Sequence, residues 1–460
     1  MTLIKSISGI RGTIGGSEGE NLTPLDVVKF CAAFCQVHQE KAGKKNIKIV
    51  VGRDARISGE MISQIASNTL IGMGAQVLDL GLSTTPTVEM AVVHFEAQAG
   101  IILTASHNPA QWNALKLLNE KGEFISAQIG EDVLRIAEQG VSYASIHEIG
   151  SIQKISGFDF HLEPILSMTL VKKDSIAEKK FKIVVDGINS SGAIFIPALL
   201  NALGVQNVVV INANTNGHFA HNPEPLAEHL HETCELVKKE KADLGIVVDP
   251  DVDRLAFIDE HGVLFGEEYT LVAIADYVLK HNKGNTVSNL SSTRALKDIT
   301  LLHGGEYYAA AVGEVNVVEK MKSVHAVIGG EGNGGIIVPT LHYGRDAIVG
   351  VALFLSHLAE CGLSVSELKK TYPLYFMGKK KVDLDPTRPS DKILERIAQL
   401  YAHEQINLID GVKIDFPDQW VHLRKSNTEP IIRIYTEAAT QKIADELADQ
   451  WINIIQQIEI

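Results

Sequence analysis

Cysteine is scarce in this sequence, and its four cysteines lack the spacing of a disulfide framework or a zinc site. Cys31 and Cys35 lie one helical turn apart, whereas Cys234 and Cys361 stand alone. No uninterrupted apolar run is long enough to span a membrane. Residues 1–12 also lack the apolar core and the cleavage site of a signal peptide. We therefore expect a reduced, cytoplasmic protein that does not bind a membrane.

Positive charge is also in deficit. The 460 residues include 42 Lys and Arg against 56 Asp and Glu, which gives a formal net charge of −14. Such a charge argues against a general nucleic-acid-binding protein. It does not argue against an anionic small molecule, because a binding site can be locally cationic. The chain is too long for one ordinary core, so we expect about two to four domains.

Strand and helix patterns alternate along most of the chain, which is typical of α/β layers. A strand that runs into a polar loop and then a helix occurs at 47–72 and again at 181–203, with a looser copy from 284. From about Tyr372 the pattern changes to a helix, two short strands and a last helix, and the link near Asp383–Ser390 is rich in Pro and Asp. We expect three related α/β mixed-sheet domains plus a C-terminal α+β domain around a central cleft. The expected domains are 1–155, 156–257, 258–371 and 372–460.

The repeat places three loops at equivalent positions, each just after a strand. These loops are Thr104–Pro109, Asp249–Arg254 and Gly329–Gly335. In open α/β sheets, ligands bind outside the carboxyl ends of the strands. We therefore expect the three loops to face one cleft.

Ser106 lies in the first of these loops, after the apolar run Ile101-Ile102-Leu103. Its hydroxyl has three possible roles: a helix N-cap, a hydrolase nucleophile, or a carrier of a transferred group. The sequence A-S-H-N is not the G-x-S-x-G of a nucleophile elbow, which argues against a hydrolase. The helix cap stays open, because residues 106–118 are compatible with the start of a helix.

The second loop places Asp249, Asp251 and Asp253 on alternate residues. Hard cations such as Mg²⁺ take oxygen ligands, and a short curved loop can direct all three carboxylates inward. Together with Glu260, the three aspartates have the spacing of an EF-hand loop. Arg254 stands where that loop needs glycine, and the flanking residues have strand patterns, so an EF-hand is excluded. A solvated acidic turn is the alternative, although three carboxylates repel one another without a cation.

Two further loops suit a sugar phosphate. The glycine-rich residues 330–335 satisfy G-x-G-x-x-G, but no helix follows, so they make a weak dinucleotide signature. Glu331 and Asn333 can hydrogen-bond sugar hydroxyls, although a flexible turn is equally compatible. The segment Arg424–Pro430, with Arg433 after it, combines cations, hydroxyls and an amide that suit a phosphate group, whereas a polar hairpin turn is the alternative.

A serine beside a cation site and a phosphate-binding loop has the parts of a phosphoryl-transfer enzyme. A phosphoserine carries close to two negative charges, and a divalent cation would balance them. The motifs "TASHNP" with Lys116, "DPDVDR", "GEGNGG" and "RKSNTEPIIRIYTEA" occur in that order, and "SGIRG" and "GRDARISG" fit too. Over essentially its whole length the chain resembles the α-D-phosphohexomutases.

The resemblance implies a heart-shaped, four-domain isomerase with one loop from each domain in a central cleft. Phosphate would move between O1 and O6 of a hexose through a phosphoserine and a 1,6-bisphosphate, which also serves as activator. The sugar loop favours phosphoglucosamine mutase, which converts glucosamine 6-phosphate to glucosamine 1-phosphate; phosphomannomutase/phosphoglucomutase is the alternative. Two other classes stay open, a Mg²⁺-dependent sugar phosphatase and a non-catalytic sugar-phosphate-binding module. The implied partner is a small phosphosugar, and the chain is a monomer or a homodimer.

The resemblance also implies a role for each matching residue. Mg²⁺ would be held by the Ser106 phosphate with Asp249, Asp251 and Asp253. The reaction centre would consist of Ser106, His107, Lys116 and Arg11. The substrate would be bound by Arg254, Glu331, Asn333, Arg424, Ser426, Asn427, Thr428 and Arg433.

Two departures from the family pattern bear on mechanism. Pro250 replaces a glycine that is frequent in the metal loop, which removes one N–H. Gly335 stands where many bacterial members have a histidine, which leaves the general acid or base open and directs attention to Lys116. A lysine is a poor base unless burial or nearby cations lower its pKa.

Overall fold

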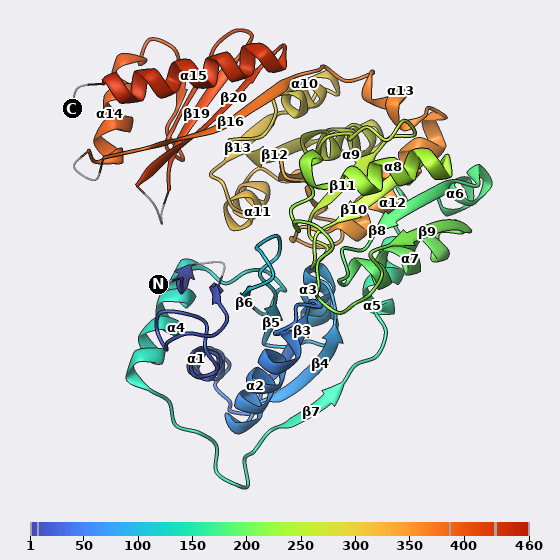
Figure 1. Ribbon diagram of the computed structural model, residues 1–460. Coiled ribbons are helices and arrows are strands. Elements are labelled where there is room, and N and C mark those ends of the chain that lie inside the picture. The colour runs from blue at the N-terminus through green and yellow to red at the C-terminus, as the bar shows by residue number, and fades with distance from the viewer. Residues whose placement is uncertain (1, 7–8, 386–387, 427–429, 459–460) are drawn as a thin grey trace. The chain divides into compact units, whose positions relative to one another are not determined.

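A computed structural model describes residues 2–6, 9–385, 388–426 and 430–458 (Figure 1). The chain divides into two compact units. The first consists of Met1–Thr270 with Asn333–Leu368, and the second of Leu271–Gly332 with Lys369–Ile460. The expected fold class, α/β with mixed sheets and a C-terminal α+β part, is confirmed. Among the described residues, no helix is both long enough and apolar enough to cross a membrane.

The first unit begins with a seven-stranded mixed sheet in the order β1-β2-β6-β5-β3-β4-β7. Its strands are β1 (Ile4–Ser6), β2 (Gly9–Thr13), β3 (Lys48–Arg53), β4 (Gln76–Leu82), β5 (Ala99–Leu103), β6 (Trp112–Leu118) and β7 (Ser151–Lys154). Strand β3 runs parallel to β4 and β5, whereas β6 is antiparallel to β5. The helices of this region are α1 (Pro24–Ala42), α2 (Gly59–Gly72), α3 (Thr85–His94) and α4 (Ala127–Gln139).

Both faces of this sheet are buried, which explains the continuous apolar run of β3. Ile49 and Val51 pack with α1, α2 and α4, whereas Val50 between them packs with α3 on the other face. Helix α1 begins at a capping box in which Thr23 and Asp26 satisfy each other's backbone N–H groups.

The second sheet of the first unit has the order β11-β10-β8-β9. Its strands are β8 (Lys182–Asp186), β9 (Asn207–Ile211), β10 (Leu244–Val248) and β11 (Leu255–Ile258). The same unit contains α5 (Asp159–Leu166), α6 (Lys173–Lys179), α7 (Gly192–Ala202), η1 (Ala227–His229), α8 (His231–Glu240), β15 (Gly335–Ile337) and α12 (Ala347–Cys361). The chain passes between the units in α9 (Glu267–His281) and α13 (Val365–Lys369), and in the turn after β14.

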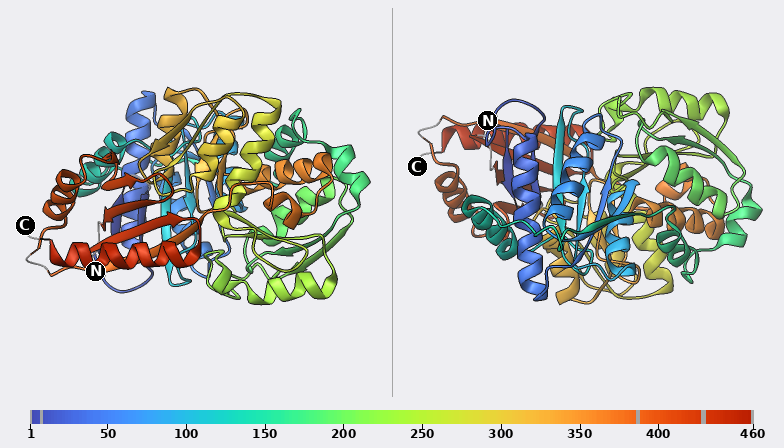
Figure 2. Two further views of the ribbon diagram at one scale, coloured as in Figure 1. Left: turned by 90° about the horizontal axis from the view of Figure 1, so that it is seen from above. Right: turned by 90° about the horizontal axis from the view of Figure 1, so that it is seen from below.

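The second unit contains the parallel strands β12 (Asn285–Asn289), β13 (Tyr307–Ala310) and β14 (Ala326–Glu331), with α10 (Ala295–Leu302) and α11 (Glu314–Ser323). Its C-terminal part is an antiparallel sheet in the order β16-β20-β19-β18-β17. The elements of this part are β16 (Phe376–Asp383), α14 (Ser390–Leu400), β17 (Gln405–Asn407), β18 (Val412–Asp415), β19 (Trp420–Lys425), β20 (Ile431–Ala438) and α15 (Gln441–Gln457). Helices α14 and α15 cover one face of this sheet, where Ile397 and Trp451 join its apolar core (Figures 1 and 2).

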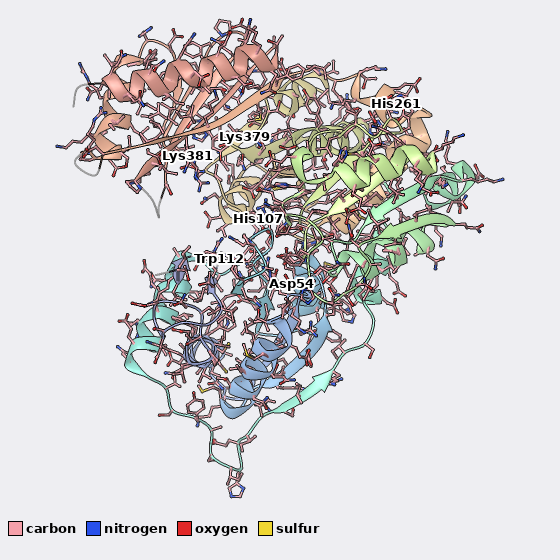
Figure 3. All side chains as sticks on the ribbon, viewed as in Figure 1. Asp54, His107, Trp112, His261, Lys379 and Lys381 are labelled. Carbon is pink, nitrogen blue, oxygen red and sulfur yellow. The ribbon has the colours of Figure 1, made fainter. Side chains whose placement is uncertain are left out.

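Two details differ from the sequence expectations. Residues 112–118 form strand β6 and not a helix, so the helix-cap alternative for Ser106 is wrong. The stretch that ends at Asp383 forms strand β16, which was not predicted from the sequence. This strand lies at a sheet edge, and its exposed Lys379 and Lys381 (labelled in Figure 3) interrupt the apolar pattern that marks central strands.

Candidate active site

Ser106 lies in the loop that joins β5 to β6, directly after the fully buried strand β5. Its backbone has a positive φ of 48°, which is uncommon for a residue with a side chain and marks a constrained turn. The Ser106 N–H donates to Thr104 Oγ1 at 2.9 Å, and the Ser106 Oγ donates to Asp249 Oδ2 at 2.6 Å. The loop therefore presents the serine hydroxyl to the acidic loop that follows β10.

A buried ion pair between Arg56 and Asp54 supports the serine loop. Arg56 Nε lies 3.1 Å from Asp54 Oδ2, and both side chains are fully buried. The Arg56 guanidinium donates to four carbonyl groups of the loop, which belong to Ser106, Asn108, Pro109 and Trp112. Figure 3 labels Asp54, His107 and Trp112 in this region. Because one planar cation ties several backbone carbonyls together, the position of the serine is fixed before any ligand binds.

The acidic loop joins β10 to β11, and all three of its aspartates are fully buried. Asp249 Oδ1 accepts the backbone N–H groups of Asp253 and Arg254 at 3.1 Å each, which curls the loop around this carboxylate. As a result, a carboxylate oxygen from each of Asp249, Asp251 and Asp253 lies within 4.8 Å of the others.

Two cations partly balance this buried negative charge. Lys116 Nζ lies 2.6 Å from Asp251 Oδ2 and 3.1 Å from Asp253 Oδ2. Arg345 Nη2 donates to the same Asp253 Oδ2 at 2.7 Å. Asp251 Oδ2 also accepts from Thr85 Oγ1 at the start of α3, at 2.6 Å.

The remaining oxygens fit a divalent cation. Asp251 Oδ1 and Asp253 Oδ1 are buried and have no hydrogen-bond partner among the described residues. Leaving such atoms without water or a partner is costly, and a hard cation such as Mg²⁺ prefers this kind of donor. The donor set of the acidic loop is therefore suited to Mg²⁺.

The charges of the site shift several pKa values. Burial and the neighbouring Asp251 and Asp253 raise the pKa of Asp249 well above its usual range. Burial favours neutral Lys116, but Asp251 and Asp253 outweigh it and raise the lysine pKa. Lys116 is therefore an ammonium group and a hydrogen-bond donor in this arrangement, not a free base.

Three further predicted residues lie around the same loop. Burial and the Arg254 charge lower the pKa of His107 to about 2, so its imidazole is neutral at physiological pH. Burial and Arg254 also lower the pKa of Arg11. Arg254 Nη1 lies 3.3 Å from Glu224 Oε1. His107, Arg11 and Arg254 are thus brought together with Ser106 and the aspartates in the first unit.

The predicted sugar loop is held in shape by its own side chains. Glu331, at the end of β14, accepts from Asn289 Nδ2 at 2.9 Å and from the Gly313 N–H at 3.1 Å. Asn333 Oδ1 accepts the Gly335 N–H at 3.2 Å.

Gly335 leaves space for Arg345. A Cβ atom at position 335 would lie 2.3 Å from Arg345 Cδ, so no larger side chain, a histidine included, fits without moving this arginine. The position of Arg345, which pairs with Asp253, therefore requires a glycine where many family members have a histidine.

The predicted phosphate loop follows β19 in the second unit. Arg424 on β19 lies directly opposite Arg433 on β20. Two like charges across a strand pair are destabilising unless anions balance them. Arg424 Nε forms an ion pair with Asp410 Oδ2 at 2.8 Å. Ser426 donates its N–H to the Ile431 carbonyl. Asn427 and Thr428 lie outside the described residues.

Four residues of the site were not among those predicted: Asp54, Arg56, Thr85 and Arg345. The segment "GRDARISG" fits the family pattern and was the available signal for Asp54 and Arg56. Thr85 and Arg345 stand in no motif with a chemical reading, and only the folded chain brings them to Asp251 and Asp253.

Comparisons with known proteins agree with this arrangement of motifs. Four family models match in order: Phosphoglucomutase/phosphomannomutase alpha/beta/alpha domain I at residues 3–144, domain II at 159–262, domain III at 266–375, and the C-terminal domain at 381–454. The chain belongs to the phosphoglucomutase/phosphomannomutase family. Its relatives and structural neighbours are phosphohexomutases, which are isomerases, so the predicted family and enzyme class are confirmed.

Individual relatives cover nearly the whole chain. A Phosphoglucomutase/phosphomannomutase of Thermococcus kodakarensis is 35% identical over 97% of this chain and 98% of its own length. A Phosphoglucosamine/phosphogalactosamine mutase of Sulfurisphaera tokodaii is 33% identical, over 97% of this chain and 98% of its own.

Solved structures share the fold. A putative phosphomannomutase from Thermus thermophilus has a TM-score of 0.84 at 24% identity and covers 99% of each chain. An Aspergillus fumigatus N-acetylphosphoglucosamine mutase in complex with GlcNAc-6P and magnesium has a TM-score of 0.58 at 15% identity, over 94% of this chain and 97% of its own.

Proposed function

We propose that this phosphohexomutase interconverts glucosamine 6-phosphate and glucosamine 1-phosphate through a phosphoserine at Ser106 and a hexose 1,6-bisphosphate. The observation that carries the proposal is the 2.6 Å contact between Ser106 Oγ and Asp249 Oδ2, beside two buried carboxylate oxygens that accept no hydrogen bond from the described residues. A hydroxyl held against a cation site is where a phosphoryl group can be stored and transferred.

The proposed transfer balances without any further reactant. A sugar hydroxyl forms a new P–O bond while the bond between phosphorus and Ser106 Oγ breaks, and the hydroxyl proton ends on Ser106 Oγ. The bisphosphate then turns round, and its other phosphate returns to Ser106 by the reverse step. A phosphatase would instead give the phosphoryl group to water.

The roles of the first-unit residues follow from their charges. Bound to the three aspartates, Mg²⁺ would supply positive charge to the transferring phosphoryl group. Lys116, held as a cation by Asp251 and Asp253, would donate a hydrogen bond to that group. Neutral His107 can donate or accept a hydrogen bond at the reacting hydroxyl, and Arg11 and Arg254 would bind phosphate oxygens.

The second-unit residues would bind the rest of the substrate. Glu331 would hydrogen-bond sugar hydroxyl or amino groups. Asn333, which belongs to the first unit, would do the same. Arg424, Ser426 and Arg433 would hold the phosphate that does not react, as would Asn427 and Thr428 by family resemblance. The arginine pair opposite each other on β19 and β20 supports this assignment.

The choice of sugar rests on the relatives. The Sulfurisphaera tokodaii relative is named for glucosamine and galactosamine, and relatives from three other archaea are named probable phosphoglucosamine mutases. The Thermococcus kodakarensis relative favours phosphomannomutase/phosphoglucomutase as the second candidate. A cytoplasmic location and a monomer or homodimer stay predictions.

Initial rates with glucosamine, glucose and mannose 1-phosphates, each with Mg²⁺ and a trace of bisphosphate, test the proposal. We expect the highest kcat/KM with glucosamine 1-phosphate and near-complete loss of turnover in Ser106→Ala. The exposed Ser145 provides a matched control, since Ser145→Ala should retain wild-type rates. A higher kcat/KM for glucose or mannose would overturn the sugar assignment, and an active Ser106→Ala would overturn the phosphoserine.

A further inference from the structure

A second cluster of metal-ligand side chains lies in the first unit and shares no residue with the acidic loop. It consists of His161 on α5, His342 in the segment between β15 and α12, and Asp346 at the N-terminus of α12. One ligand atom of each lies within 4.8 Å of the others. His161 and Asp346 are fully buried, and the His342 side chain is 9% exposed.

The Nε2 atoms of both histidines point toward one carboxylate oxygen, Asp346 Oδ2. His161 Nε2 lies 2.9 Å from Asp346 Oδ2, and His342 Nε2 lies 3.2 Å from it. The other oxygen, Asp346 Oδ1, accepts the N–H groups of Ile348 and Val349, so the carboxylate is fixed by the helix it caps. Three donors thus meet at one point: two imidazole nitrogens and one carboxylate oxygen.

Each imidazole is also oriented from behind by a residue of α3. His161 Nδ1 lies 3.0 Å from Thr87 Oγ1, and His342 Nδ1 lies 3.3 Å from Glu89 Oε2. Histidines that bind a metal are normally held in this way, with the second nitrogen bonded to a carboxylate, hydroxyl or carbonyl. Gly344 gives Glu89 its space, because a Cβ at 344 would lie 1.8 Å from Glu89 Oε2.

We propose that His161, His342 and Asp346 bind one divalent transition-metal ion, with Zn²⁺ as the preferred occupant. Two imidazoles and a carboxylate suit Zn²⁺ better than Mg²⁺, which takes oxygen ligands. The two buried carboxylates, Asp346 and Glu89, balance the charge of a divalent ion.

The bound ion would join three parts of the first unit and support the acidic loop from outside. It ties α5 to the N-terminus of α12, and Glu89 and Thr87 tie α3 to the same point. Residues adjacent to this cluster reach the aspartates: Thr85 on α3 donates to Asp251, and Arg345, next to Asp346, donates to Asp253. The proposed role of this site is therefore structural.

The test measures metal content directly. The full-length protein is stripped with a chelator, incubated with Zn²⁺ in the presence of excess Mg²⁺ to fill the acidic loop, desalted and analysed by elemental mass spectrometry. We expect one equivalent of Zn²⁺ in the wild type, almost none in His161→Gln or His342→Gln, and one in His94→Gln. His94 is an exposed histidine on α3 and serves as the matched control. We also expect Co²⁺ loading to give visible absorption bands in the wild type that His342→Gln lacks.

Two further variants separate metal binding from folding. Glu89→Gln and Thr87→Ala keep all three ligands, so each should still bind Zn²⁺, with an affinity lowered by roughly 10- to 100-fold. If the wild type retains no Zn²⁺, or if His161→Gln and His342→Gln, folded by circular dichroism, retain as much as the wild type, the proposal is wrong.

Discussion

Replacing Lys116 by methionine tests the electrostatic account of the acidic loop. Lys116 Nζ lies 2.6 Å and 3.1 Å from two fully buried carboxylates. Removing one partner of a buried ion pair costs about 3–5 kcal/mol, because the remaining charge is left unpaired. We therefore expect the thermal midpoint of Lys116→Met in EDTA to fall about 5 °C below that of the wild type, because 1 kcal/mol shifts the midpoint of a chain of this length by roughly 1–2 °C.

Mg²⁺ should reverse much of this loss, because a divalent cation in the loop replaces the missing positive charge. We expect saturating Mg²⁺ to reverse at least about half of the fall in thermal midpoint. Mg²⁺ should also raise the midpoint of Lys116→Met by more than it raises that of the wild type. Turnover should nevertheless fall by roughly 10²-fold or more, because the donor to the phosphoryl group is absent.

The assay is thermal denaturation followed by circular dichroism, with EDTA and with Mg²⁺. Lys121→Met is the matched control, since this exposed lysine follows the same strand and should leave the midpoint unchanged. If Mg²⁺ gives Lys116→Met no more stability than it gives the wild type, the acidic loop does not bind the cation and the reasoning fails.

Three other predictions follow from the same structure. Asp251→Asn should raise the Mg²⁺ concentration needed for half-maximal activity by roughly 10²-fold, because a buried charged ligand is lost; an unchanged Mg²⁺ dependence would refute the assignment. Gly335→Ala should displace Arg345 and cost about 1–3 kcal/mol, whereas Gly130→Ala, where a Cβ meets only Ile125 at 3.9 Å, should cost nothing; equal midpoints for the two variants would contradict the close approach of Arg345. Burial and Lys41 lower the pKa of His38 to about 4, below its unfolded value of about 6.5, so protonation favours unfolding and stability falls as pH drops from about 6.5 to 4. Between about pH 6.5 and 4, the free energy of unfolding of His38→Gln should fall by about 3 kcal/mol less than that of the wild type, as measured by denaturation at each pH. Equal pH profiles for the two proteins would refute the assignment.

The sequence was sufficient for the parts of the site that lie close together along the chain. The Asp249–Asp253 loop and Ser106 each follow a run of buried apolar residues, and this local pattern predicts a strand followed by a loop. The α/β class follows from the same periodicity.

Contacts between distant segments were not predictable in this way. Arg345 reaches Asp253 across 92 residues, and the Arg56 guanidinium reaches the serine loop across about 50, with no spacing rule to connect them. The exposed lysines of β16 interrupt its apolar pattern, so this edge strand was not predicted, and its pairing with β20 is visible only in the folded sheet. The interpretation of Lys116 as a base changed for the same reason, because its pKa depends on two carboxylates more than 130 residues away.

The most direct test of the central claim is phosphorus NMR of the purified protein with Mg²⁺, glucosamine 1-phosphate and a trace of hexose 1,6-bisphosphate. We predict conversion to the 6-phosphate without release of inorganic phosphate, and a phosphorylated Ser106 in the intact-mass and peptide spectra of the same sample. Accumulation of free phosphate, or turnover without phosphate on Ser106, would contradict it.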